Sequence, residues 1–125
     1  LGARLGGDNI TTHLTPLSTG VDMVEACINI ALGMSADIKK KYDKGSAIRY
    51  FSVDYGHIKD ILHVEEARKI TGVVQVSIVH GKGEELDGIR SSGDRVGFVI
   101  TQGYNAQDAI SKVEEASSIV KFELC

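Results

Sequence analysis

Fourteen glycines and a single proline most constrain how this 125-residue chain can fold. Glycine accounts for about 11% of the residues, against an average near 7%. Glycine adopts positive φ without steric cost, so it is favoured wherever a chain turns tightly. Because proline is nearly absent, the glycines indicate tight turns between short elements rather than a flexible linker. We therefore expect several short helices and strands, closely connected.

The overall composition is that of an ordinary folded domain. Hydrophobic residues make up 42% and charged residues 25% of the chain, and the net charge is −3. This excludes a disordered polymer, and the length fits one domain or one domain with a small appendage. No strongly basic run indicates a nucleic-acid surface. No stretch of about 20 apolar residues is present that would span a bilayer. We expect neither nucleic acid nor a membrane as a partner.

The two cysteines, Cys27 and Cys125, are too few for a disulfide framework, and no CxxC pair is present. Cys27 falls within an apolar helical pattern, which favours a place in the core. Cys125 is the last residue of the chain. We expect two free thiols in a reducing compartment, and therefore a cytoplasmic protein.

The first half of the chain contains one clear helical pattern. Apolar residues recur at helical spacing in Val21, Val24, Cys27, Ile28, Ala31 and Leu32. Thr19 is the expected N-cap, and Gly33 is the expected C-terminal stop. The preceding residues 1–20 are rich in glycine and hydroxyl side chains and are expected to form a loop.

From residue 47 onward the pattern alternates between strands and helices. The expected order is strand 47–53, strand 57–62, helix 64–70, strand 73–80, a strand through Val96, Phe98 and Ile100, a helix capped by Asn105, and strand 121–124. Residues 81–88 are expected to be a solvated acidic loop. This order predicts an α+β fold, in which helices cover one face of a small, mainly antiparallel sheet.

The chemistry is concentrated in the first twenty residues. Arg4 precedes Gly6-Gly7-Asp8, and an arginine beside a Gly-Gly turn can present its guanidinium where the backbone approaches a ligand closely. Thr12 and His13 follow as possible ligand contacts. The run is neither a Walker A motif nor GxGxxG. Ser18 and Thr19 suit an anion at a helix N-terminus, although capping explains them equally well. The alternative is a surface loop that only caps a helix.

The run GARLGGDNITTHLTPLSTGVDMVEACINIALG resembles the end of the ATP-grasp catalytic domain in carboxylate–amine ligases. Arg4 matches the arginine of the Glu-x-Asn-x-Arg motif in these ligases. The second half, DRVGFVITQGYNAQDAISKVEEA, is similar to their C-terminal cap domain. The resemblance implies an L-amino acid ligase or a phosphoribosylglycinamide synthetase-like protein. It divides the chain into the end of the catalytic region, 1–45, and a cap domain, 46–125.

The resemblance also implies an activity. ATP-grasp ligases phosphorylate a carboxylate with ATP, and an amine then attacks the acyl phosphate, with Mg²⁺ as the metal. Arg4 would be the catalytic residue. The substrate contacts would be Gly6, Gly7, Asp8, Thr12 and His13.

The same resemblance limits what this chain would do alone. The asparagine of the metal-binding motif falls at Gly2 and its glutamate before Leu1. We therefore expect no bound ATP or metal and no turnover in the isolated fragment. Its expected partners are an upstream ATP-grasp core of the same chain, the carboxylate and amine substrates and, as a further option, a second copy in a homodimer.

A different class of function stays open at this stage. The chain would then be a stand-alone α+β module that binds a small metabolite or another protein. A metabolite would be gripped by the loop at residues 1–20. Such a module would need neither ATP nor an upstream domain.

Overall fold

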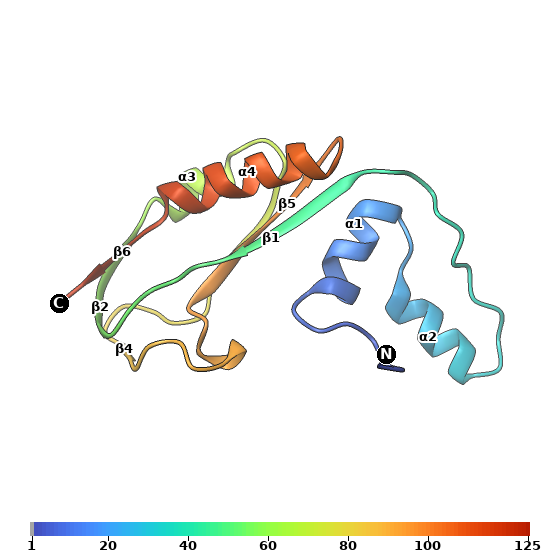
Figure 1. Cartoon of the computed structure of the whole chain (residues 1–125), viewed down its shortest axis with the longest axis horizontal. Coiled ribbons are helices and arrows are strands. Elements are labelled where there is room, and N and C mark those ends of the chain that lie inside the picture. Colours follow the sequence, from blue (N-terminus) through green and yellow to red (C-terminus); the bar gives the residue numbers. More distant parts are fainter. Residues whose placement is uncertain (1) are drawn as a thin grey trace.

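In the computed structural model, which describes residues 2–125, six strands form two antiparallel sheets of three strands each (Figure 1). Leu1, the first residue of the expected segment 1–45, lies outside the described residues. The elements are η1 (Ile10–Leu14), α1 (Thr15–Thr19), α2 (Met23–Ala31), β1 (Gly45–Tyr50), β2 (Gly56–Leu62), α3 (Val64–Arg68), β3 (Val73–Ile78), β4 (Glu85–Leu86), η2 (Ser92–Asp94), β5 (Gly97–Gly103), α4 (Ala106–Ile119) and β6 (Lys121–Leu124). The strand orders are β1-β5-β3 and β4-β2-β6.

The β1-β5-β3 sheet is covered on both faces. Side chains alternate between the two faces of a strand, so each face carries every second residue of β5. Thr101 lies on the face covered by α4, and its buried hydroxyl donates to the carbonyl of Ala109 at 2.7 Å. Gln102 lies on the opposite face, and its amide donates to the carbonyl of Leu17 at 2.6 Å. The N-terminal segment η1–α1 therefore packs on the face that α4 leaves free.

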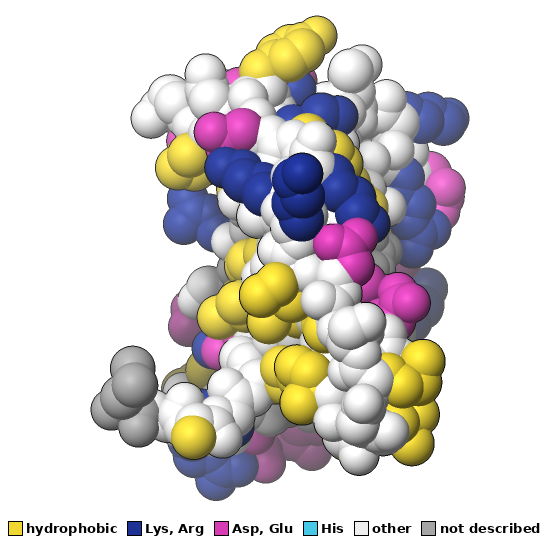
Figure 2. Space-filling view, turned by 90° about the vertical axis from the view of Figure 1, so that its right-hand side faces the viewer, with side chains coloured by type: hydrophobic (Ala, Val, Ile, Leu, Met, Phe, Trp, Pro, Cys, Tyr) yellow, Lys and Arg dark blue, Asp and Glu magenta, His cyan; other side chains and the backbone are white. Residues whose placement is uncertain are grey.

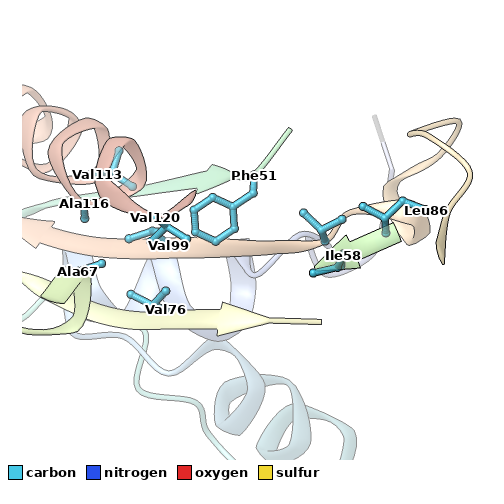
Figure 3. Packing of buried hydrophobic residues seen from close by; sticks show 10 residues of the cluster. Phe51, Ile58, Ala67, Val76, Leu86, Val99, Val113, Ala116 and Val120 are labelled. Atoms are coloured by element: carbon cyan, nitrogen blue, oxygen red, sulfur yellow. The ribbon is translucent and has the colours of Figure 1, made fainter. Parts of the chain in front are cut away.

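The main core lies between the sheets and helices α3 and α4 (Figure 3). Val76 of β3 and Val99 of β5 are register partners, and both are buried. Phe51 follows β1, and its ring lies 5.4 Å from that of Phe122 in β6. Phe51 and Phe122 thus join the two sheets. The full set of buried cluster members is Phe51, Ile58, Ala67, Val76, Leu86, Val96, Val99, Val113, Ala116 and Val120.

The expected α+β class is confirmed, and helices α3 and α4 pack on the same side of the β1-β5-β3 sheet. The expected single sheet is divided in two, because the chain leaves β1 at Phe51 and β2 then pairs with β4 and β6 in a separate sheet. The two-residue strand β4 was not expected. It forms inside the acidic loop because Leu86 is buried against β2.

The N-terminal segment differs more from the expectation. Residues 10–19, expected as a loop, are helical. Thr19 ends α1 instead of capping α2, and its hydroxyl donates to the carbonyl of Thr15 at 2.7 Å. Asp22 is the true N-cap of α2, where it accepts from the N–H groups of Val24 and Glu25. A carboxylate accepts two such bonds more strongly than a hydroxyl does.

Helix α2 projects from the rest of the molecule (Figure 1). Its Ala26 is buried, but Cys27, expected in the core, is only partly buried. An extended segment, residues 34–44, then returns along α1, where the Lys41 N–H donates to the Thr19 carbonyl at 2.8 Å. No helix among residues 2–125 has the length and apolarity needed to cross a membrane.

Candidate functional site

The Gly6-Gly7-Asp8 loop turns sharply before η1. The Ile10 N–H donates to the Gly7 carbonyl at 2.9 Å. Asp8 and Asn9 have positive φ values of 53° and 62°. Aspartate and asparagine are the non-glycine residues that tolerate this left-handed region best, because their short polar side chains bond locally. The loop is therefore a defined turn that fixes the direction of the Asp8 side chain.

Arg4 and the glycines line one hollow beside this turn. The hollow has a volume of about 530 Å³ and is lined by Gly2, Arg4, Leu5, Gly6, Gly7, Asp8 and Ile10. Arg4 is exposed, and its Nη1 donates to the Leu5 carbonyl at 3.0 Å. A Cβ at Gly6 would crowd Ile10 at 3.2 Å, whereas Gly7 has open space around it. The hollow thus combines bare backbone with a guanidinium, which suits an anionic ligand.

Asp8 is paired with an arginine that is distant in sequence. Its Oδ1 accepts a hydrogen bond from Nη1 of Arg95 at 2.9 Å. The Arg95 guanidinium also stacks on the Tyr50 ring, 3.9 Å from the ring centroid. Asp8, Tyr50 and Arg95 line a second hollow of about 340 Å³. Asp8 therefore lies between two hollows, with Arg4 in one and Arg95 in the other.

The sequence reasoning gave Arg95 and Tyr50 no place in the site. They lie 87 and 42 positions from Asp8, so no spacing rule connects them. Arg95 belongs to the run DRVGFVITQGYNAQDAISKVEEA, which resembles the cap domain and not the site. An arginine next to a buried central strand was the one available signal.

Thr12 and His13 stand apart from Arg4 and Asp8. Thr12 is exposed, and its hydroxyl lies 2.8 Å from Nδ1 of His13. Neither residue lines the two hollows next to Asp8. Of the predicted site residues, the structure therefore brings together Arg4, Gly6, Gly7 and Asp8.

Ser18 and Thr19 do not form an anion site at a helix N-terminus. Both lie in the last turn of α1, and the Ser18 hydroxyl donates to the Leu14 carbonyl at 2.9 Å. Their hydroxyls are used inside the helix. Within residues 2–125, no group of three or more His, Cys, Asp or Glu side chains is arranged to hold a metal ion.

The turn before Arg95 is ordered by a carboxylate. Asp94 accepts from the N–H groups of Arg90 and Ser91 at 3.0 and 2.7 Å. These hydrogen bonds hold the pKa of Asp94 below its ordinary value, because they favour the charged form. Arg95 therefore lies between a fixed turn and the central strand β5.

Two solved structures share this fold. A phosphoribosylglycinamide synthetase from Anaerococcus prevotii matches with a TM-score of 0.80 and 17% identity, over 98% of this chain and 32% of its own. An L-amino acid ligase from Bacillus licheniformis matches with a TM-score of 0.79 and 18% identity, over 99% of this chain and 31% of its own. This chain thus spans about a third of either protein.

No curated protein matches the chain in sequence. A family model does match residues 49–124, which include β2 to β6 and nearly all of the main core. This model represents the family called L-amino acid ligase C-terminal domain 2. The match covers more than half of the chain, and the fold agrees with it. The chain therefore belongs to the family of the L-amino acid ligase C-terminal domain 2.

Proposed function

We propose that this chain is the C-terminal part of an ATP-dependent ligase that joins a carboxylate to an amine through an acyl phosphate. The observation that carries the proposal is the family match over residues 49–124. The two ligases of known structure support it, because this chain matches nearly its whole length to about a third of each. The remaining two thirds would hold the parts of the enzyme that this chain lacks.

Arg4 is the catalytic residue in this proposal. An acyl phosphate is attacked by an amine through a tetrahedral intermediate whose oxyanion needs fixed positive charge. The Arg4 guanidinium borders the 530 Å³ hollow and, among residues 2–125, donates one hydrogen bond, to the carbonyl of its neighbour Leu5. Its remaining donors are available to oxygens of the reacting group. Gly6 and Gly7 would allow the substrate to approach the backbone. Thr12 and His13 would contact a part of the substrate that lies outside this hollow.

The residues that the structure describes do not fit a magnesium site. Among residues 2–125 no suitable cluster of ligands exists, and Gly2 stands at the position of the asparagine ligand. ATP and Mg²⁺ would therefore be held by the rest of the longer protein. The isolated chain is expected to be inactive. Its two thiols are unpaired, which supports the reducing cytoplasm as its location.

An exposed apolar stripe on α2 supports an upstream core as the partner. The stripe consists of Val24, Ile28 and Leu32, which are 36%, 55% and 69% exposed. Their spacing of four residues puts them on one side of the helix. Figure 2 shows hydrophobic side chains gathered over the lower half of the side that carries α2. Such a stripe is normally buried against a core, so the upstream part of the ligase would cover it.

The test uses the full-length protein expressed from its gene. ATP-dependent formation of amide product is measured with panels of amino acids and other carboxylates and amines. Arg4→Ala is expected to lower kcat by about 10² to 10³, the usual effect of removing one oxyanion donor. The matched control is Arg90→Ala, which removes an exposed arginine whose one ion pair is long, at 3.9 Å from Asp87.

Two results would count against the proposal. The first is a wild-type protein that forms no ATP-dependent product with any pair of substrates. The second is near-normal turnover of Arg4→Ala, which would leave the ligase activity standing but remove Arg4 from its chemistry. Circular dichroism of the variants shows whether the fold survives.

A further inference from the structure

The contact between Asp8 and Arg95 joins two segments that are 87 residues apart in the sequence. Asp8 belongs to the loop next to Arg4. Arg95 is separated by one residue, Val96, from the start of β5, the central strand of the β1-β5-β3 sheet. Nη1 of Arg95 lies 2.9 Å from Oδ1 of Asp8. The arginine is thus the point where the sheet meets the loop.

Arg95 is more firmly held than an ordinary surface arginine. Its side chain is 27% exposed, against 54% for Asp8. Its guanidinium stacks on Tyr50, whose ring meets the ring of Phe98 edge-on at 5.8 Å. Tyr50 and Phe98 are register partners on β1 and β5. Stacking on an aromatic ring fixes the plane of a guanidinium before it binds a carboxylate, so less rotamer freedom is lost in forming the pair.

The fixed guanidinium of Arg95 can hold the Asp8 side chain in one direction. Its φ of 53° lies in the left-handed region, which aspartate tolerates but which is still less favourable than the ordinary regions, so a contact such as that with Arg95 helps to maintain it. Asp8 lines both hollows, so a change in its direction alters the wall that faces Arg4. Half of its side chain is exposed, which leaves the carboxylate accessible to a cationic ligand.

We propose that Arg95 is a positioning residue of the ligase site, which holds Asp8 in place so that the free side of its carboxylate binds the amine substrate. This inference rests on the proposed function. It makes the cap domain a determinant of amine binding. Arg95 itself does not touch the reacting atoms.

The first experiment compares steady-state kinetics of three variants in the full-length enzyme. Arg95→Met keeps a long apolar side chain over Tyr50 but removes the bond to Asp8. We expect the KM for the amine to rise about tenfold, with kcat and the KM for ATP changed much less. Arg95→Lys keeps the charge and should recover part of the loss. Arg49→Met is the control. It removes the ion pair between Arg49 and Glu114, at 3.3 Å, on the opposite face of the same sheet.

The same kinetics in a double variant distinguish a role through Asp8 from a separate one. If Arg95 acts through Asp8, then adding Arg95→Met to Asp8→Asn raises the amine KM no further. Multiplied effects, or an Arg95→Met enzyme that behaves like Arg49→Met, would overturn the proposal.

The second experiment does not depend on the activity. Hydrogen–deuterium exchange of the full-length protein is followed by mass spectrometry in peptides that cover residues 5–14. Arg95→Met should raise exchange there about tenfold, because the turn loses its anchor, whereas Arg49→Met should not. Unchanged exchange would refute the positioning role even in an active ligase. If exchange is faster in a protein that has no ligase activity, Arg95 anchors the turn but the proposed function is wrong.

Discussion

Two glycines let helix α4 rest directly on the sheet. Gly45 of β1 and Gly103 of β5 are register partners. A Cβ at Gly45 would lie 2.6 Å from the Ala106 nitrogen and closer still to the Asn105 carbonyl. A Cβ at Gly103 would lie 2.5 Å from the Ala109 nitrogen. Real Cβ atoms keep at least 3.0 Å from such atoms, so either alanine must lift the first turn of α4.

The size of the effect follows from what the alanine meets. Overpacking a tight site costs about 1–3 kcal/mol, and the neighbour here is helix backbone, which cannot turn away as a side chain does. The steric cost of Gly45→Ala should therefore lie near the upper end of this range, at about 3 kcal/mol of unfolding free energy. Replacing glycine also stiffens the unfolded chain, which returns about 0.5 kcal/mol. The net loss of about 2.5 kcal/mol corresponds to a fall of about 10 °C in Tm for a chain of this length.

Urea and thermal unfolding of Gly45→Ala, Gly103→Ala and the double variant provide the measurement. Both alanines push on the same turn of α4, so the double variant should lose less than the sum of the two single losses. Gly81→Ala is the control, since the nearest atom to its Cβ is Glu84 Oε1 at 3.7 Å and its φ is ordinary. A Gly45→Ala protein within about 0.5 kcal/mol of wild type would refute the steric reasoning, because a neutral surface change has that size.

Acid should weaken the fold partly through Asp108, because the Lys112 ammonium holds the pKa of its carboxyl below the ordinary value of 3.8. A lowered pKa gives stability that is present above pH 3.8 and is lost as the pH falls through the pKa of the folded state. Asp108→Asn should therefore flatten this part of the pH–Tm profile. An unchanged profile would contradict the assignment. The isolated chain should self-associate through the α2 stripe, and Ile28→Lys with Leu32→Lys should restore the monomer in light scattering, whereas Val79→Lys, at an exposed residue outside the stripe, should not. A wild-type chain that is already a monomer would contradict the second prediction.

The regular elements of residues 45–125 were largely predictable. The alternation of Val74, Val76 and Ile78 predicts a strand, and β3 is found at Val73–Ile78. Asn105 predicts the start of α4, and its side chain accepts from the Asp108 N–H at 2.9 Å. These predictions succeed because periodicity and capping are local properties. The boundary between 45 and 46 stays a prediction, although β1 begins at Gly45.

The first twenty residues were harder to predict. Thr11 and Thr12 read as loop residues because hydroxyl side chains are weak helix formers. Both lie in the helical segment η1, where Thr11 is buried, so tertiary packing outweighs their low propensity. Arg4, Gly6, Gly7 and Asp8 were named from sequence as one group, and the structure places them around one hollow. Their roles in binding and catalysis stay predictions.

The sequence by itself determined the local structure and the family pattern. These depend on residues within about one helical turn of each other, or on a motif read in order. Only the tertiary structure decided that Arg95 meets Asp8 and that the apolar stripe of α2 stays uncovered. The Asp8–Arg95 contact requires the loop before η1 and the segment before β5 to approach one another across 87 residues of chain. That approach is set by packing on both faces of the β1-β5-β3 sheet, which no local pattern encodes.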